Sequence, residues 1–188
     1  MTASRTPMAA TDEELQRIPS LLSADHSTGG EQASVHLLEY GDYECASCSE
    51  AGLETQHLLE VFGSRLRFTF RHFPLAEHPH AEQAAEAAEA AAAQDKFWPM
   101  HRLLLTHWQH LDREVLAQCA EQAGLDLPTF VAAMNQHTYK GRVQEHRRSG
   151  ELIGLRASPC FFLNGELVDV SFGLEHLERA VREALGEA

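Results

Sequence analysis

Hydrophobic and polar residues change their spacing several times along the chain, and each change marks an expected element. Residues 34 to 40, SVHLLEY, form an apolar, strand-like run. Residues 45 to 62 carry apolar side chains at helical spacing and precede a glycine, which favours a helix with a glycine C-cap. Residues 65 to 73, RLRFTFRHF, alternate apolar with polar positions, which predicts a half-buried strand. The order strand, helix, strand predicts a βαβ unit.

Helical spacing dominates the middle of the chain and gives way to strands near its end. Residues 76 to 155 contain an alanine-rich run followed by further segments of helical periodicity. Residues 160 to 170, CFFLNGELVDV, predict two short strands joined at an Asn-Gly pair, which favours a tight hairpin turn. Residues 174 to 185 have the pattern of an amphipathic helix. The chain is therefore expected to be an α/β protein in which an all-helical insertion of about eighty residues separates a βαβ half from a ββα half.

The same pattern gives the expected domain organisation. Residues 1 to 33 are predicted to be a flexible lead-in, with a short helix from Thr11 to Arg17 because acidic residues follow the capping threonine. Residues 34 to 75 and 156 to 188 are expected to form one domain, which residues 76 to 155 interrupt as the helical insertion.

Composition narrows the classes of function. The chain has 188 residues, of which 44% are hydrophobic and 23% charged, as in a single globular domain. The net charge of −13 argues against a nucleic-acid partner, since a phosphate-binding surface needs clustered Lys and Arg. We find neither a signal-peptide pattern nor an apolar run long enough to span a membrane, so we expect a cytoplasmic protein without a membrane partner.

Two of the four cysteines, Cys45 and Cys48, stand at the predicted junction between strand and helix. The pair suits half of a zinc site, a structural disulfide or a redox-active disulfide. Zinc needs about four ligands, and neither Cys119 nor Cys160 belongs to a second CxxC, so no metal site is predicted. A disulfide across two residues removes little chain entropy. The redox interpretation is favoured, because a helix N-terminus stabilises a thiolate at Cys45, and Cys48 is one turn deeper.

A proline far downstream supports the redox interpretation. Pro159 directly precedes the first strand of the hairpin, where a proline removes a ladder hydrogen bond. The Ser158–Pro159 peptide bond can be cis at modest energy. A cis bond here is expected to turn the backbone of Ser158 toward the cysteine pair, where it can hold the extended chain of a substrate.

Several motifs together resemble the DsbA-like thiol–disulfide oxidoreductases of the thioredoxin superfamily. They are LLEYGDYECASC, RFTFRHFPL, HPHAEQAAEAAEAA, KFWPMHRLL and SPCFFLNG, and the resemblance covers about residues 34 to 186. It implies a thioredoxin fold without a cofactor, with Cys45 as the nucleophile, Cys48 as the resolving thiol and Pro159 as the cis-proline. It also implies that Glu39 is a buried acid that accepts or relays a proton as Cys48 reacts. The implied partners are proteins or small molecules that carry a disulfide or thiol, and the electron partner stays open.

The sequence departs from the family pattern at two positions. Ser158 replaces a threonine or valine, and Cys160 replaces a threonine. Cys160 is expected beneath the active site, either as a third exchanging thiol or, as we favour, as a small buried apolar residue. Cys119 is expected to be a buried free thiol, although a disulfide with Cys160 stays open.

Residues around the cysteines also predict the redox poise. Ala46 and Ser47 supply no cation, and the acidic Asp42 and Glu44 are expected to oppose thiolate formation. We therefore predict a potential nearer to that of thioredoxin, about −270 mV, than to that of DsbA, about −120 mV. The sequence His78-Pro79-His80 is expected to have a capping or surface role rather than to bind metal.

Two alternatives to a thiol–disulfide oxidoreductase stay open. One is a thioredoxin-like module that senses redox state or binds a partner without turnover. The other is a glutathione-dependent isomerase or transferase, although such relatives commonly have a single active-site Ser or Cys. The direction of the reaction stays open as well, and the expected cytoplasmic location favours reduction.

Overall fold

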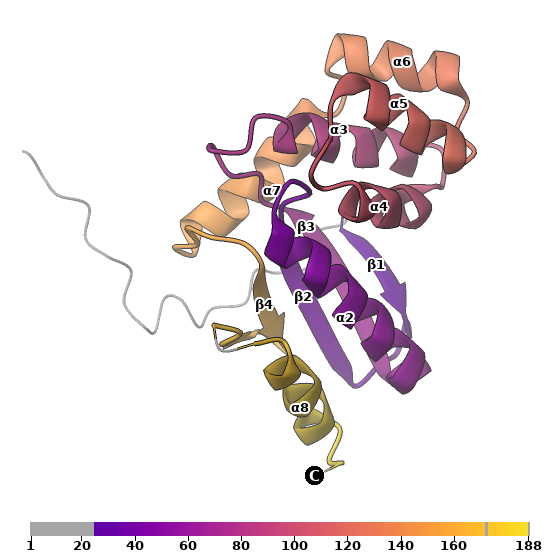
Figure 1. Cartoon of the computed structure of the whole chain (residues 1–188). Helices are drawn as coiled ribbons and strands as arrows, with labels where there is room; N and C mark the ends of the chain where they lie inside the picture. Colours follow the sequence, from indigo (N-terminus) through magenta and orange to yellow (C-terminus); the bar gives the residue numbers. More distant parts are fainter. Residues whose placement is uncertain (1–24, 172, 188) are drawn as a thin grey trace, which may run out of the picture.

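The computed structural model describes residues 25–171 and 173–187. The predicted helix at Thr11 to Arg17 lies outside the described residues. Within these residues, five strands and eight helical segments follow one another in an α/β order, in which helices occupy the chain between β3 and β4 (Figure 1). The strands are β1 (His26–Gly29), β2 (Val35–Gly41), β3 (Leu66–His72), β4 (Cys160–Leu163) and β5 (Glu166–Val168). The helices are α2 (Ala46–Phe62), η1 (Gly63–Arg65), α3 (Ala81–Ala92), α4 (Phe97–Thr106), α5 (Arg113–Gln122), α6 (Leu127–Gln136), α7 (Lys140–Leu152) and α8 (Glu175–Ala184).

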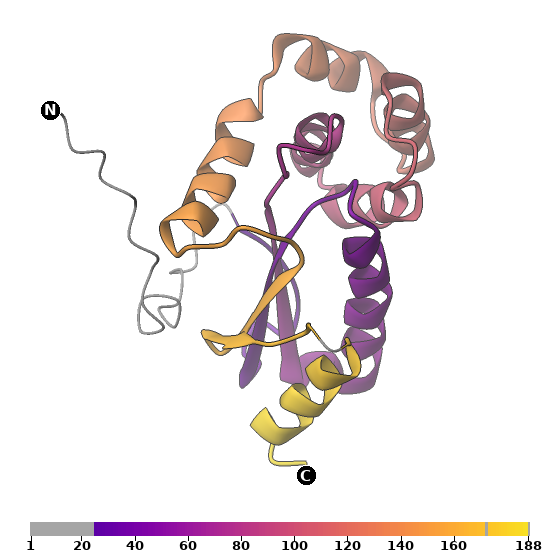
Figure 2. The ribbon, with the colours of Figure 1, turned by 60° about the vertical axis from the view of Figure 1, so that its left-hand side comes forward.

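The strands form one sheet in the order β1-β3-β2-β4-β5. The central pair, β2 and β3, is parallel, and the other neighbours are antiparallel. Helices α2 and α8 lie on one side of the sheet, whereas α7 lies on the other (Figure 2). The predicted α/β class and the order βαβ, helices, ββα are thus confirmed.

The sheet separates two groups of buried apolar side chains. The larger group, the main core, contains Leu37 and Phe161 together with residues of α2, α8 and the α3–α7 region. The smaller group, the second cluster, consists of Leu38, Tyr40, Phe73, Leu155 and Phe162. Because neighbouring residues of a strand point to opposite faces, β2 contributes to both groups.

Strand β1 corrects the predicted lead-in. Residues 26 to 29 form an edge strand that pairs antiparallel with β3, although the sequence assigned residues 1 to 33 to a flexible segment. The strand is only four residues long and carries polar residues, HSTG, so it has little apolar periodicity. Its position is set by backbone pairing with β3 and by the contact between the hydroxyl oxygens of Ser27 and Thr69, 2.7 Å apart.

Strand β3 is buried on both faces, so the prediction of a half-buried strand is wrong. Its polar residues Thr69 and Arg71 are both fully buried. The Arg71 guanidinium donates two hydrogen bonds of 2.7 Å to the carboxylate of Asp25 and one of 2.8 Å to the Tyr40 hydroxyl. These contacts compensate the Arg71 charge, which would otherwise be costly to bury. A strand whose residues alternate between apolar and polar can therefore be buried on both faces.

Local signals explain several element ends. The carboxylate of Asp112 caps α5 by accepting from two backbone N–H groups, and Asp126 caps α6 in the same way through Thr129. The hairpin between β4 and β5 turns at Asn164 and Gly165, which both have positive φ as a type I′ turn requires. The alanine-rich α3 is buried along most of its length, as expected where other helices approach closely.

Over the described part of the chain, the helices are too short or too polar to cross a bilayer.

Candidate active site

The two cysteines of the CxxC motif lie where β2 passes into α2. Cys45 is the N-cap residue of α2, with extended backbone angles, and its side chain is half-buried. Cys48 lies in the first turn and is fully buried in the main core, beneath the exposed end of the helix. Both are free thiols in the structure. The junction therefore presents one accessible sulfur and one inaccessible sulfur, as the sequence predicted.

The surroundings of Cys45 favour its thiolate. A hydrogen bond from the Cys48 thiol is the main cause that lowers the pKa of Cys45 to about 5, and it outweighs the opposing effect of burial. Hydrogen bonds from the backbone N–H groups of Cys48 and Ser47, at the positive end of the helix dipole, lower the pKa further. At neutral pH Cys45 is thus a thiolate, the form that attacks disulfides.

Cys48 has the opposite electrostatic character. Burial is the main cause that raises the pKa of its thiol well above the ordinary value, and the hydrogen bond to Cys45 and the nearby Glu39 raise it further. The backbone N–H of Asp42 donates to its sulfur at 3.4 Å. Cys48 therefore keeps its proton until a base removes it.

Glu39 is a buried acid on the same side of the sheet as the cysteine pair. It lies in β2 between Phe70 of β3 and Phe161 of β4, and it is 1% exposed. Its Oε1 atom has no hydrogen-bond partner among the described residues. Burial, reinforced by the charge of Cys45, raises the pKa of Glu39 to about 8. A carboxyl group with this pKa can both give and take a proton near neutral pH.

The structure brings Ser158 and Pro159 to the same place from far along the chain. The Ser158–Pro159 peptide bond is cis. The carbonyl oxygen of Ser158 lies 3.6 Å from the Cys45 sulfur, which can donate to it only as the protonated thiol. Antiparallel pairing of β4 with β2 holds this segment beside the cysteine junction, because Tyr40 is the register partner of Cys160. All five residues singled out from the sequence thus lie in one region.

Sequence reasoning missed two carboxylate–histidine pairs beside the cysteines. The Asp42 carboxylate lies 2.8 Å from Nδ1 of His78, and the Glu44 carboxylate lies 2.8 Å from Nδ1 of His80. The predicted capping or surface role holds for His80, which is the N-cap residue of α3 with a partly exposed side chain, although this side chain makes no capping hydrogen bond and pairs with Glu44 instead. The equal spacing of the two acids and the two histidines, each two residues apart, is the signal that could have found the pairs.

These pairs also correct the predicted effect of the acidic residues. Asp42 and Glu44 were expected to oppose thiolate formation at Cys45, yet hydrogen bonds, that of the Cys48 thiol first among them, lower the Cys45 pKa overall. Asp42 is engaged by a histidine and by two backbone N–H groups. The predicted reducing potential itself stays a prediction.

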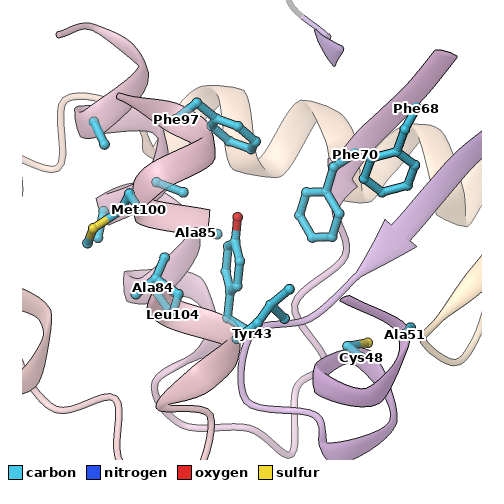
Figure 3. Packing of buried hydrophobic residues seen from close by; sticks show 14 of the residues in the cluster. Tyr43, Cys48, Ala51, Phe68, Phe70, Ala84, Ala85, Phe97, Met100 and Leu104 are labelled. Atoms are coloured by element: carbon cyan, nitrogen blue, oxygen red, sulfur yellow. The ribbon is translucent and has the colours of Figure 1, made fainter. Parts of the chain in front are cut away.

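Tyr43 links the cysteine junction to the helical insertion. Its side chain is buried, and Figure 3 shows its ring between Phe70 of the sheet and helices of the insertion. The hydroxyl lies 2.9 Å from Nδ1 of His101 in α4. The insertion therefore packs directly against the loop that carries the cysteines.

The remaining two thiols lie in different apolar clusters. Cys160 packs against the second cluster, on the opposite face of the sheet from Cys48, and its thiol donates to the carbonyl of Ala157. Burial raises the pKa of Cys160 to about 11. Cys119 is a fully buried free thiol in the main core, as predicted. These positions favour the apolar role of Cys160 over exchange with the cysteine pair.

His26, His72 and Glu89 form a cluster of potential metal ligands, all within 4.8 Å of one another. Oε1 of Glu89 already contacts Nε2 of both histidines, at 2.9 and 2.8 Å. The other carboxylate oxygen accepts from Arg142 at 3.0 Å. The three side chains pair with one another, and the Arg142 guanidinium binds the free side of the Glu89 carboxylate. The cluster therefore fits a buried ionic network better than an open metal site.

Comparison with known proteins identifies the family. Residues 22–183 match a family model described as thioredoxin, which is most of the chain. The chain belongs to the thioredoxin family. Its match includes the cysteine junction, the helical insertion and the segment around the cis peptide bond.

Solved structures show which branch of the fold the chain has. The chain superposes with oxidised BdbD from Bacillus subtilis at a TM-score of 0.79 with 19% identity, covering 90% of this chain and 97% of that one. A thioredoxin-like oxidoreductase from Silicibacter pomeroyi gives 0.75 with 23% identity over 95% and 100% of the two chains. The thiol-disulfide exchange protein alpha-DsbA2 from Wolbachia pipientis gives 0.75 with 20% identity over 86% and 87%. The fold is thus that of DsbA-like members of the thioredoxin family.

Curated relatives share more sequence but are much longer. A Na(+)/H(+) antiporter NhaA 3 from Salinispora tropica is 38% identical over 165 residues, covering 87% of this chain and 25% of the relative. An NhaA antiporter from Herminiimonas arsenicoxydans is 38% identical over 148 residues, covering 79% of this chain and 24% of the relative. The chain therefore spans about a quarter of the length of the curated relatives it matches.

Proposed function

We propose that the chain is a thiol–disulfide oxidoreductase whose nucleophile is the Cys45 thiolate and whose resolving thiol is Cys48. The observation that carries the proposal is the contrast between the two sulfurs. Cys45 is accessible with a pKa lowered to about 5 by its hydrogen bonds, whereas burial keeps Cys48 protonated. A thiolate and a thiol within one turn of a helix are what a two-step disulfide exchange requires.

In the first step, the Cys45 thiolate attacks one sulfur of a substrate disulfide. A bond forms between Cys45 and that sulfur, the substrate disulfide breaks, and the other substrate sulfur leaves as a thiolate. In the second step, Cys48 loses its proton and attacks the Cys45 sulfur. The second substrate sulfur leaves, so the substrate has gained two electrons and the protein holds a Cys45–Cys48 disulfide. The reverse sequence oxidises a dithiol.

Glu39 is the base proposed for the second step. The Cys45 charge contributes to the raised pKa of Glu39 in the reduced protein. Formation of the mixed disulfide removes that charge, so the pKa of Glu39 falls, and the group releases its proton to water or to the departing substrate thiolate and becomes a carboxylate. It can then accept the proton of Cys48, whose pKa is raised partly by the same carboxylate. The carboxylate fraction of Glu39 therefore rises at the step in which Cys48 must lose its proton.

Ser158 and Pro159 are proposed to hold the substrate. The Ser158 carbonyl already faces the Cys45 sulfur, and the cis bond turns the chain there. An extended substrate segment that pairs with the Ser158 backbone would bring its disulfide to Cys45. Proteins or small molecules with a disulfide or thiol fit this arrangement.

The redox poise of the pair follows from the thiolate. A pKa of about 5 for Cys45 lies between about 7 in thioredoxin and about 3.5 in DsbA. Since thiolate stabilisation favours the reduced form, we propose a potential between about −270 and −120 mV, a range that includes the value predicted from the sequence. The cytoplasmic location expected from the sequence stays a prediction. Ion transport is the activity named for the longer curated relatives.

Turnover of insulin disulfides with dithiothreitol tests the proposal. Wild type is expected to accelerate the reduction, Cys45→Ser to abolish the acceleration, and Cys48→Ser to reduce it severely. Cys119→Ser, which changes a buried thiol outside the site, is the matched control and is expected to behave like wild type. Equal rates for wild type and Cys45→Ser would contradict the proposal and favour a module that binds without turnover.

A further inference from the structure

Asp42 is the hydrogen-bonding centre of the cysteine junction. Its side chain is fully buried. One carboxylate oxygen accepts from the backbone N–H of Glu44, and the other accepts from the backbone N–H of Leu75, both at 2.7 Å. The second oxygen also lies 2.8 Å from Nδ1 of His78. The carboxylate thus joins the loop before α2 to the loop before α3.

The main chain of Asp42 contacts both cysteines. Its N–H donates to the Cys48 sulfur at 3.4 Å, and its carbonyl oxygen accepts from the Cys45 N–H at 3.3 Å. Any movement of the Asp42 side chain therefore reaches the Cys48 sulfur and the Cys45 backbone through one residue. Of the groups that hold this side chain, two are backbone amides, and His78 is the third.

We propose that His78 is a positioning residue for the Cys45 thiolate, acting through Asp42 as an imidazolium that neutralises the buried carboxylate and fixes the cysteine loop. Without the positive charge, the Asp42 carboxylate stays buried close to Cys45 with only neutral donors. Repulsion between the two negative groups then disfavours the thiolate. Without the hydrogen bond, the loop also loses one of the three anchors of Asp42.

The charges around His78 support this coupling. Burial alone lowers the pKa of His78, but the hydrogen bond to Asp42 and the charges of Asp42, Cys45 and Glu44 raise it overall. These acidic groups face the imidazole from the junction between β2 and α2. Its side chain is 26% exposed, so protons can exchange with solvent. Because linkage is reciprocal, a thiolate that raises the pKa of His78 has its own pKa lowered by His78 to the same extent.

His80 provides a matched comparison two residues along the same loop. It pairs with Glu44 at the same distance of 2.8 Å, but its side chain is 42% exposed. The Glu44 carboxylate accepts from the backbone N–H and ring of His80 and from neither cysteine. His80→Gln therefore removes a carboxylate–histidine pair of the same type without touching the Asp42 contacts.

The first test measures the reaction of reduced protein with iodoacetamide as a function of pH, with peptide mapping to isolate Cys45. His78→Gln keeps a neutral donor and loses the charge, and His78→Ala loses both. A rise of about one pKa unit cuts the thiolate fraction about tenfold below the pKa, so we expect Cys45 alkylation near pH 5 to fall about threefold to tenfold in His78→Gln. Far-UV circular dichroism verifies that each variant is folded. His80→Gln is expected to match wild type.

The second test is reciprocal and needs no variant of His78. The imidazole resonances of His78 are titrated by NMR in reduced wild type and in Cys45→Ser. We expect the pKa of His78 to fall in Cys45→Ser. An unchanged His78 pKa together with an unchanged alkylation profile in His78→Gln would overturn the inference, as would equal changes in His78→Gln and His80→Gln.

This inference rests on the proposed role of Cys45, but its tests measure ionisation rather than turnover. Coupling between His78 and Cys45 in a protein that fails to reduce insulin would overturn the proposed function alone. Insulin reduction by wild type with no such coupling would overturn the role of His78 alone.

Discussion

Glu39→Gln removes the buried acid beneath the cysteine pair and should change how stability depends on pH. Burial raises the pKa of Glu39 from its ordinary value of 4.5 to about 8. Below pH 4.5 the group is protonated in both the folded and the unfolded chain. Between pH 4.5 and about 8 the unfolded chain releases this proton while the folded chain retains it. The wild type should therefore lose stability as pH rises through this range.

The size of the effect follows from the width of that range. Each pH unit between the two pKa values costs the folded wild type up to about 1.4 kcal/mol, so the full range amounts to roughly 4 to 5 kcal/mol as an upper bound. The neutral side chain of Glu39→Gln does not titrate. The cost of burying the glutamine amide does not depend on pH. The pH dependence of the difference in unfolding free energy between wild type and Glu39→Gln therefore reports on the ionisation of Glu39 alone.

Urea unfolding of the reduced protein, followed by far-UV circular dichroism between about pH 4.5 and 8, measures this difference. The free energy of unfolding of Glu39→Gln relative to wild type should rise by several kcal/mol across the range. Glu50→Gln, an exposed glutamate of α2, controls for removing a carboxylate. Parallel pH profiles for wild type and Glu39→Gln would refute the reasoning, because Glu39 would then ionise equally in both states.

Three further predictions, the first with a control variant, concern the packing, a buried ion pair and the Cys160 thiol. Gly150→Ala places a Cβ 2.8 Å from a buried phenylalanine ring and should lower the free energy of unfolding by about 1–3 kcal/mol in thermal melts. Gly141→Ala, in open space on the same helix, is the control and should be neutral or stabilising. Asp25→Asn leaves Arg71 with a neutral partner in a nearly fully buried ion pair and should cost about 3–5 kcal/mol in urea titrations; a loss under 1 kcal/mol would contradict this. Cys160→Ser should leave the glutathione redox titration unchanged, since Cys160 lies on the opposite face of the sheet from Cys48; a shifted midpoint would revive thiol exchange.

The sequence predicts the framework of this fold because its strongest signals are local. The Asn-Gly hairpin, the glycine after α2 and the apolar spacing of β2 each depend on residues close together in the chain. Strand β1 has no such signal, because four polar residues are held in place by β3, about forty residues downstream. Burial of Arg71 was also hidden, since its partner Asp25 stands in the segment assigned to a flexible lead-in.

The residues of the candidate site also differ in how clearly the sequence reveals them. Cys45 and Cys48 form a motif, and Pro159 stands directly before a predicted strand, so each could be found without a structure. Asp42 and His78 carry a weaker signal, because the equal spacing of two acids and two histidines suggests their pairing but does not show their contact. As a result, the acids were expected to repel the thiolate. Electrostatic arguments from sequence fail where an unseen partner compensates the charge.

The central claim is that Cys45, and not another thiol, attacks disulfides. Reduced Cys48→Ser is incubated with oxidised glutathione near neutral pH, and the adducts are assigned by peptide mapping with mass spectrometry. The account predicts one stable mixed disulfide, located on Cys45, because the resolving thiol is absent and the remaining thiols are unreactive. An adduct mainly on Cys119 or Cys160, or none on Cys45, would contradict it.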